Sequence, residues 1–354
     1  MERRLTESLS TKQVLEEGPK LIATIKAEIR KVVYGEEYED FIDLLVLAII
    51  RGGHLYTRAN VGTAKTLACL AVSRTLAGGG FSKVDFQPDL IPKDLAGFLF
   101  YNQKTEEFVT LKGPLLKDER DRDVNIFLAN EINRGTPKLQ SALLSAMEEK
   151  TITIHTTTYS LPAVFTVLAT MNPQEHEGVF LLPEATLDRF TFRVELPPIS
   201  KETEMEILTD REIWRSITER VKERVKPVAD LKDIIHLREV FFSKIHIESW
   251  ILSYIADLRR AIEEHENGKG TRDVASISPR ASIELRNTAF LVAGSEGRDY
   301  VRPEDVKKYA RQVLTHRVLM VPELARDPHR KYGPREIVKE VLEEVRPEEP
   351  ENVR

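Results

Sequence analysis

Residues 57–71, TRANVGTAKTLACLA, decide how the rest of this chain is interpreted. A short run with strand character leads into them, a turn is expected at Gly62, and Lys65 and Thr66 then open a helix. Free amides and the positive dipole end of a helix favour phosphate, Lys65 can reach terminal phosphates, and the Thr66 hydroxyl can bind magnesium. The stretch therefore predicts a phosphate-binding loop.

The match to a phosphate loop is imperfect. The strict pattern has glycine at both ends of the loop, and these places hold Ala59 and Ala64. Taken alone, a glycine followed three residues later by Lys-Thr is also an ordinary helix start. The choice between the two interpretations therefore depends on motifs further along the chain.

Length and composition limit the class of protein. A chain of 354 residues that is 41% apolar and 31% charged can bury a core and predicts roughly two domains. The longest apolar run, residues 41–50, is interrupted by Asp43 and is too short to span a bilayer, and the polar start lacks a signal-peptide core. We expect a cytoplasmic protein without a membrane partner.

Charge and cysteine content exclude further classes. The net charge of −5, from 52 basic and 57 acidic residues, argues against a strongly basic nucleic-acid-binding protein. The single cysteine, Cys69, cannot form an internal disulfide, and its place in the predicted helix after the loop favours a packing role. No cysteine-based zinc site is predicted.

Hydrophobic patterning divides the chain near residue 200. Residues 124–129 and 164–169 are nearly continuous apolar runs, typical of strands covered on both faces by helices, and residues 191–196 alternate as a further strand. Short paired strands at 107–111, 151–155 and 159–161 predict projecting hairpins. Helices are expected at 19–32 and 37–51, and beyond Ser200 only helices, at 202–216, 231–242, 248–264, 279–294 and 303–320.

Polar residues follow two of the predicted strands. Asn130 and Glu131 end the first, in the place where nucleotide hydrolases hold magnesium and the attacking water, and Asn172 follows the second. An arginine, Arg189, precedes the last strand and can meet charge on a transferring phosphate. Each signal also has a plain structural interpretation: polar residues where a strand reaches the surface, and a surface pair of Asp188 with Arg189.

The order of these features resembles that of the AAA+ ATPases, and within them the MoxR family. The resemblance covers roughly residues 30–320 and rests on seven motifs taken together. They are GTAKT at 62–66, FQPDLIPKDLAG at 86–97, GPL at 113–115, NEINR at 130–134, SALLSAMEE at 141–149, ATMNP at 169–173, and EG at 177–178 with LPEATLDRF at 182–190.

The resemblance implies a doubly wound parallel α/β core over residues 1–199, an all-helical lid over 200–320 and a charged C-terminal tail over 321–354. It implies a ring, usually hexameric, that binds ATP and magnesium and uses hydrolysis to remodel partner proteins, often von Willebrand factor A-type proteins. A scaffold subunit that holds nucleotide without turnover is the alternative. A third interpretation is a relative of the magnesium-chelatase or replicative-helicase motors, and the lack of basic excess counts against a DNA motor.

The family's functional residues carry over by position. Thr66 and Asn130 fall at the metal site, Glu131 polarises water, Asn172 acts as sensor one, Arg189 as the arginine finger and Arg280 as sensor two. The expected nucleotide contacts are Val33, Tyr34, Gly35, Asn60, Val61, Gly62, Thr63, Ala64, Lys65 and Thr66.

Three departures from the family pattern bear on activity. Ala59 and Val61 replace a glycine and a proline of the loop, and Asn130 replaces an aspartate. The amide at position 130 supplies no negative charge, so we expect weaker magnesium retention and slower hydrolysis with nucleotide binding largely intact. On this basis Asn130→Asp is expected to raise turnover about tenfold, or roughly 1.4 kcal/mol of barrier.

Overall fold

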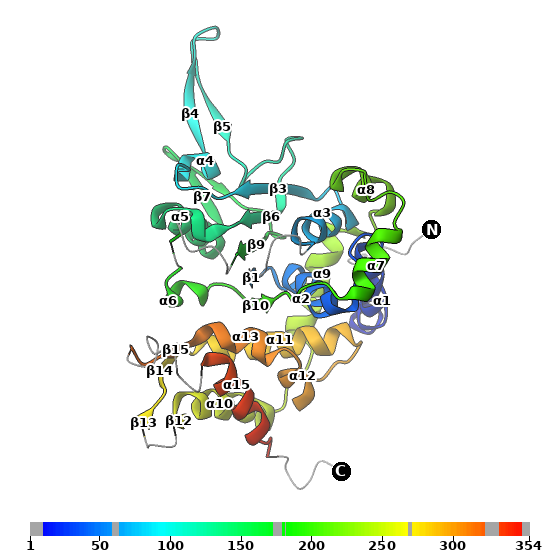
Figure 1. Cartoon of the computed structure of the whole chain (residues 1–354), viewed down its shortest axis with the longest axis vertical. Helices are drawn as coiled ribbons and strands as arrows, with labels where there is room; N and C mark the ends of the chain where they lie inside the picture. Colours follow the sequence, from blue (N-terminus) through cyan, green and yellow to red (C-terminus); the bar gives the residue numbers. More distant parts are fainter. Residues whose placement is uncertain are drawn as a thin grey trace. The chain divides into compact units, whose positions relative to one another are not determined.

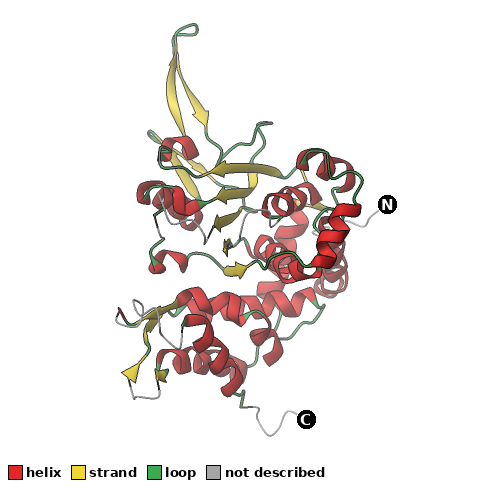
Figure 2. Cartoon of the chain, in the orientation of Figure 1, coloured by secondary structure: helices red, strands yellow, loops and turns green. Residues whose placement is uncertain are grey.

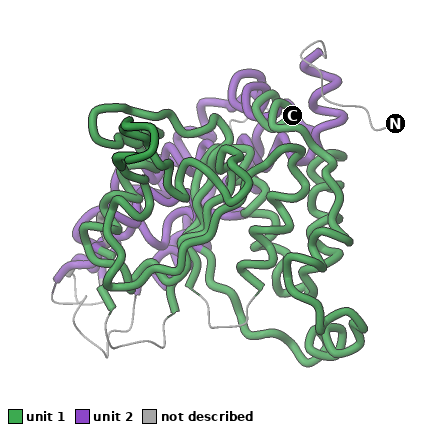
Figure 3. The backbone as a smooth tube through the Cα atoms, turned by 90° about the horizontal axis from the view of Figure 1, so that it is seen from above, with its two compact units in different colours: residues 1–7, 20–182, 194–236 green, residues 8–19, 183–193, 237–354 purple. Residues whose placement is uncertain are grey.

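The structure is a computed structural model that describes residues 10–58, 64–172, 179–180, 182–267, 271–322 and 333–348. The chain forms two compact units, shown in different colours in Figure 3. The first unit contains residues 20–182 and 194–236, and the second contains residues 8–19, 183–193 and 237–354. The domain limits predicted from the sequence stay a prediction.

A five-stranded sheet forms the centre of the first unit, in the order β10-β1-β9-β6-β3 (Figure 1). The pairs β1 with β9, β9 with β6, and β6 with β3 are all parallel. This order confirms the predicted α/β class with a parallel sheet, and it makes the two apolar runs neighbours. The strands are β1 (Leu55–Arg58), β3 (Gly80–Asp85), β6 (Val124–Asn130), β9 (Thr166–Met171) and β10 (Phe192–Glu195).

Helices pack on this sheet through apolar faces. The loop helix, α3 (Lys65–Thr75), contacts β3 and β6 and buries Cys69, where burial raises the pKa of the thiol. Helix α2 (Glu39–Arg51) packs on β1 and ends at Gly52, whose left-handed backbone stops the helix. Helix α5 (Pro137–Glu149) begins where the Thr136 hydroxyl accepts a hydrogen bond from the Leu139 amide.

Two antiparallel hairpins belong to the first unit, as the sequence predicts. Strand β7 (Thr151–Ile154) pairs with β8 (Thr157–Ser160), and β5 (Glu107–Lys112) pairs with β4 (Gly97–Asn102). Hairpin β4–β5 extends away from the rest of its unit (Figure 2). The sequence did not indicate β4, because the short helix α4 (Pro92–Ala96) runs directly into it at Gly97.

The region beyond residue 200 is mainly helical, but the expectation that it holds no strands is wrong. Strand β14 (Val274–Ile277) pairs antiparallel with β15 (Val318–Met320), and β12 (Glu266–Asn267) pairs with β13 (Thr271–Arg272). A two-residue strand, β11 (Ala229–Asp230), pairs with β2 (Leu76–Ala77). Strands of two to four residues are too short to show a two-residue alternation that stands out from helical patterning.

Two of the helical ranges expected in this region are divided into shorter elements. The range predicted over 202–216 is α7, which ends at Thr209, and a separate helix α8 follows after a turn. The range over 303–320 divides into α12, α13, the turn η3 (Thr315–Arg317) and β15. The full set is α7 (Lys201–Thr209), α8 (Ile217–Arg224), α9 (Leu231–Lys244), α10 (Ser249–Glu263), α11 (Arg280–Ser295), α12 (Pro303–Lys308) and α13 (Ala310–Leu314).

Both ends of the chain carry a helix that the sequence did not indicate correctly. Helix α1 (Thr11–Arg30) continues through Pro19 instead of starting there, because Val14 and Ile22 on either side of the proline are both buried. Helix α15 (Pro334–Glu344) lies within the predicted charged tail and buries Ile337 and Val338, so part of this segment packs against the protein. None of the helices in the described residues combines the length and hydropathy needed to cross a bilayer.

Candidate functional site

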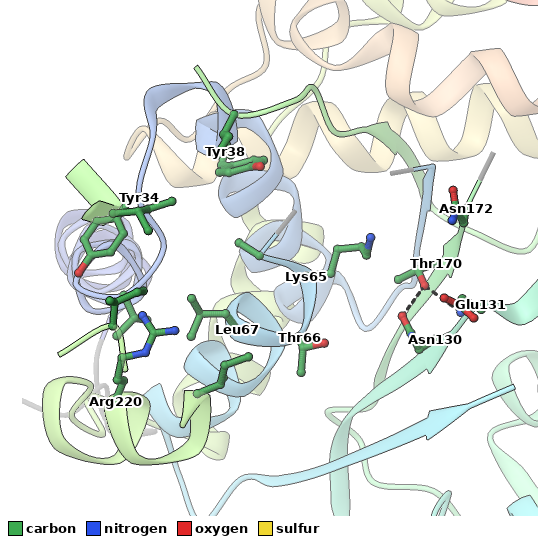
Figure 4. A pocket seen from close by; sticks show the side chains of 16 residues that line it. Tyr34, Tyr38, Lys65, Thr66, Leu67, Asn130, Glu131, Thr170, Asn172 and Arg220 are labelled. Carbon is green, nitrogen blue, oxygen red and sulfur yellow. Dashed lines mark hydrogen bonds between the residues drawn. The ribbon is translucent and has the colours of Figure 1, made fainter. Parts of the chain in front are cut away.

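A cavity of about 410 Å³ opens in the first unit beside the start of α3 (Figure 4). Its polar side is formed by α3 and by the carboxyl ends of β6 and β9, and its apolar side by the bend after α1 and by the segment around α7 and α8. The lining residues are Val32, Tyr34, Tyr38, Ala64, Lys65, Thr66, Leu67, Asn130, Glu131, Thr170, Asn172, Ile199, Ile207, Ile213, Ile217 and Arg220.

The start of α3 brings three predicted contacts to this cavity, Ala64, Lys65 and Thr66. Ala64 has a left-handed backbone with φ 48°, a conformation that disfavours a residue with a side chain. The predicted contacts Asn60, Val61, Gly62 and Thr63, together with Ala59, lie outside the described residues. Among the described residues of the predicted loop, the strained backbone is at Ala64, directly before α3.

Lys65 extends from α3 toward the polar side of the cavity, where Figure 4 shows its ammonium facing Thr170 and Asn172. Partial burial lowers the pKa of Lys65, and the Glu131 carboxylate acts in the opposite direction. A half-buried ammonium has lost part of its hydration, and a single nearby carboxylate offsets this only in part. A bound phosphate adds negative charge beside the ammonium, so the cavity is suited to an anionic ligand.

Hydrogen bonds join the ends of β6 and β9. The Glu131 amide donates to Thr170 Oγ1 at 2.9 Å, and the Thr170 hydroxyl donates to Asn130 Oδ1 at 2.9 Å. Asn172 lies just beyond β9 and lines the same cavity, as expected for neighbouring strands. The structure thus brings together four residues that the sequence singled out, Lys65, Asn130, Glu131 and Asn172.

Glu131 has an unusual backbone, with φ 54° and ψ 50°. A left-handed conformation costs a residue with a side chain about 1 kcal/mol or more, and it persists only where neighbours hold it. Here the bond to Thr170 and the following turn η2 (Ile132–Arg134) fix it, and the carboxylate lies 3.1 Å from Arg134 Nε. Strain of this kind is typical of residues whose side chain must point to a particular place.

Most of the apolar side of the cavity was not foreseen from the sequence. Of the predicted nucleotide contacts Val33, Tyr34 and Gly35, Tyr34 lines the cavity, whereas the Val33 side chain is fully buried and Gly35 does not line it. Tyr38 and Arg220 line it too, and the Tyr38 hydroxyl and Arg220 Nε are buried without a hydrogen-bond partner among the described residues. An apolar space lined by aromatic and aliphatic side chains fits a heteroaromatic base.

An ionic network fastens the α7–α8 segment to this side of the cavity. Tyr34 Oη donates to Asp210 Oδ2 at 2.9 Å, and Arg224 donates to both, at 2.7 Å to Tyr34 Oη and at 2.6 Å to Asp210 Oδ1. The Arg224 guanidinium holds the pKa of Asp210 well below its usual range, and burial raises the pKa of Tyr34. Tyr34 and Asp210 are far apart in the sequence, so no local pattern indicates their contact.

The predicted arginines lie in the second unit. Arg189 follows the short helix α6 (Glu184–Leu187), and Arg280 opens α11. Asp188 accepts hydrogen bonds from Arg317 Nε at 2.9 Å and Ser278 Oγ at 3.2 Å, and Arg280 Nη1 lies 3.8 Å from it. Asp188 therefore joins the segment that carries Arg189 to the start of α11.

The donor set at the polar side suits a hard cation bound with phosphate. Among the described residues there is no cluster of three or more His, Cys, Asp or Glu side chains able to hold a metal alone. Magnesium usually takes one or two protein oxygens and completes its shell with water and phosphate. The Thr66 hydroxyl and the Asn130 amide oxygen line the cavity and fit that role.

Comparison with family models gives two matches. Residues 54–192 match the model described as "ATPase family associated with various cellular activities (AAA)". Residues 274–341 match the model of the AAA lid domain. The first match covers the predicted phosphate loop, β6 and β9, and the second covers α11 and most of α15.

Individual proteins match over most of the chain. The chaperone MoxR1 of Mycobacterium tuberculosis is 33% identical over 90% of this chain and 80% of its own length. The protein MoxR of Methylorubrum extorquens is 30% identical over 85% of this chain and 88% of its own length. A crystal structure of a protein from Cytophaga hutchinsonii superposes with a TM-score of 0.82 and 32% identity, covering 95% of this chain and 98% of that one.

Proposed function

The chain belongs to the MoxR family of AAA ATPases, a chaperone-like family, and from this premise we propose that it hydrolyses ATP and uses the energy to remodel partner proteins. The single observation that carries the proposal is the cavity in which Lys65, Thr66, Glu131 and Asn172 meet an apolar space lined by Tyr34. A polar half suits the phosphates and an apolar half suits the base.

The residues of this cavity divide the work of hydrolysis. Lys65 and the amides at the start of α3 neutralise the terminal phosphates. Glu131 orients the attacking water and accepts its proton, and the Asn172 amide holds that water against the terminal phosphate. Thr66 and Asn130 would hold magnesium, which would screen the phosphate charge.

Assembly and partners form the second part of the proposal. The subunits form a ring, hexameric as in the family, in which Arg189 reaches a neighbouring subunit's nucleotide and Arg280 acts from the lid, residues 200–320. The client is a protein, with von Willebrand factor A-type proteins as the first candidates, and the work takes place in the cytoplasm. The relative named chaperone MoxR1 supports a protein as the client.

A nucleotide-binding scaffold without turnover is the second candidate function. The observation that favours it is Asn130, which places an amide where the family has a carboxylate. Both functions predict nucleotide binding, so binding alone does not separate them.

Steady-state phosphate release by the purified chain separates the two functions. An active ATPase releases phosphate in proportion to enzyme, and Glu131→Gln, which keeps shape and removes the base, lowers the rate at least about hundredfold. A parent rate equal to that of Glu131→Gln, with tight ATP binding in both, supports the scaffold and contradicts the ATPase.

A further inference from the structure

Asp85 is the last residue of β3 and lies directly opposite Asn130 in the parallel register of β3 and β6. Its Oδ1 accepts a hydrogen bond from Asn130 Nδ2 at 2.8 Å. A carboxylate therefore stands one side chain behind the position at which a carboxylate is expected and an amide is found. Neither the motifs nor the cavity lining pointed to Asp85.

The hydrogen bonds around Asn130 fix which way its amide faces. Thr170 Oγ1 accepts from the Glu131 amide and donates its own hydrogen to Asn130 Oδ1. A carboxylate can only accept, so the amide nitrogen of Asn130 faces Asp85 and its oxygen faces the hydroxyl, which can donate. Asp85 thus holds the Asn130 oxygen on the side of Thr170 and the cavity.

The charge of Asp85 is only partly balanced. Lys83 Nζ lies 3.0 Å from the same oxygen, Oδ1, and both side chains are substantially exposed, which weakens this pair. Asp85 Oδ2 has no hydrogen-bond partner among the described residues. A negative charge is therefore present at this edge of the sheet, although not at position 130.

We propose that Asp85 supplies the magnesium site with the negative charge that Asn130 lacks, and that it acts through Asn130 as a positioning residue. The inference rests on the proposed function. It divides one task between two side chains: Asn130 offers the oxygen toward the cavity, and Asp85 orients that oxygen and provides the charge. On this proposal, Asn130 and Asp85 together do what a single aspartate would do at the magnesium site.

The pair changes what is expected of Asn130→Asp. In the parent fold this substitution places two carboxylates within hydrogen-bonding distance, and like charges so close oppose each other's ionisation. The tenfold gain expected from the sequence is therefore replaced by no gain or a loss. Behaviour close to that of the parent is expected when Asp85→Asn accompanies it, because the double variant keeps one carboxylate and one amide.

The test is the magnesium dependence of nucleotide binding, measured by calorimetry with a non-hydrolysable ATP analogue. Asp85→Asn is expected to weaken the apparent magnesium affinity roughly tenfold, since one charge near a divalent ion is lost. The double variant Asp85→Asn, Asn130→Asp is expected to return to within about threefold of the parent, and Asp85→Glu to retain part of the effect. Asp257→Asn, the same change at an exposed site on α10, is the matched control and leaves the affinity unchanged.

The outcomes separate this inference from the function on which it rests. A parent that binds no nucleotide overturns both. A parent with magnesium-dependent binding and an unchanged Asp85→Asn variant overturns the role of Asp85 alone, and so does a double variant as weak as Asp85→Asn. Melting temperatures of all variants show whether a loss is merely unfolding, and in that case Asp85→Glu, which keeps the charge, decides by its magnesium affinity.

Discussion

At the scale of single residues, the polar side of the cavity is organised by backbone strain and by one shared hydroxyl. Ala64 and Glu131 both have left-handed backbones, and they lie at the ends of the two segments that face each other across the site. Thr170 links Glu131 to Asn130 by accepting from one and donating to the other. Removing the Thr170 hydroxyl would remove a hydrogen bond from both residues. The positions of Glu131 and Asn130 therefore depend on a residue that has no proposed part in the reaction itself.

Lys65→Ala is expected to abolish nucleotide binding, because Lys65 is the charge on α3 that faces the polar side of the cavity. A loss of at least about hundredfold in affinity, or roughly 2.7 kcal/mol, is the expected size for a charge-assisted contact to phosphate. Calorimetric titration with ATP measures it. Lys138→Ala, an exposed lysine on α5, serves as control, and an unchanged affinity for Lys65→Ala contradicts the phosphate-loop interpretation.

His54 gives the first unit a defined pH dependence. Its buried ring accepts the Val167 amide at Nδ1, and burial lowers the pKa of His54 to about 3. The unfolded chain takes up the proton near the ordinary value of 6.5, so the stability is fully present above that pH and is lost as pH falls toward 3.

The loss between pH 7 and pH 5 amounts to about 2 kcal/mol from His54, at 1.4 kcal/mol per pH unit below 6.5. Urea unfolding at both pH values measures it. We expect the His54→Gln variant to be less stable than the parent at pH 7. Its free energy of unfolding should fall less steeply with decreasing pH, by the slope that corresponds to about one proton. Equal slopes for parent and variant would show that His54 does not titrate in this way.

At the scale of elements, the cavity lies between the carboxyl edge of the sheet and the α7–α8 segment. The carboxyl ends of β6 and β9 supply fixed polar groups, because parallel neighbours end at the same edge of the sheet. The α7–α8 segment supplies isoleucines from three separate places, Ile207, Ile213 and Ile217. The polar half is held by the sheet, and the apolar half depends on how this segment is fastened.

That difference explains which half the sequence predicted. Asn130, Glu131 and Asn172 follow long apolar runs, so their place at one edge follows from local patterning and from strands being neighbours. The apolar half depends on Tyr34 meeting Asp210 and Arg224 across a long separation in the chain. The α7 range was predicted too long because the turn after Thr209 is set by this contact, which has no local signal.

Arg224→Ala is expected to weaken nucleotide affinity about tenfold while the phosphate-binding groups stay in place. The change leaves the Asp210 carboxylate without its main partner and frees the segment that lines the apolar half. Comparing adenosine with ATP by calorimetry locates the loss, which should be proportionally as large for adenosine. Arg215→Ala removes an exposed ion pair with Glu223 on the same segment, and the interpretation fails if both variants behave alike.

At the scale of the whole molecule, the groups proposed for one reaction lie in two compact units. Lys65, Glu131 and Asn172 belong to the first unit, whereas Arg189 and Arg280 belong to the second. Asp188, next to Arg189 in the chain, contacts Ser278 and Arg280 at the start of α11. In the proposed ring, the arginine of one subunit would serve the nucleotide of the next, so these groups need not meet within one chain.

Mixing two inactive variants tests whether Arg189 acts across a subunit boundary. Arg189→Ala lacks the arginine but keeps Glu131, and Glu131→Gln lacks the base but keeps Arg189, so neither releases phosphate alone. In a mixed ring, a site works when an Arg189→Ala subunit has a Glu131→Gln neighbour. Random one-to-one mixing therefore restores roughly a quarter of the parental rate per chain, since two independent conditions are each met half the time.

The control for this complementation is a mixture of Lys65→Ala with Glu131→Gln, which shares no complete site because both changes fall on the nucleotide's own subunit. The mixtures are measured at a concentration where sedimentation shows full assembly, and again after dilution to monomer, where restored activity disappears. If Arg189→Ala with Glu131→Gln is as inactive as this control in fully assembled rings, Arg189 does not serve a neighbouring site. Turnover per chain that stays constant on dilution leads to the same conclusion, because a subunit that hydrolyses ATP alone needs no arginine from another.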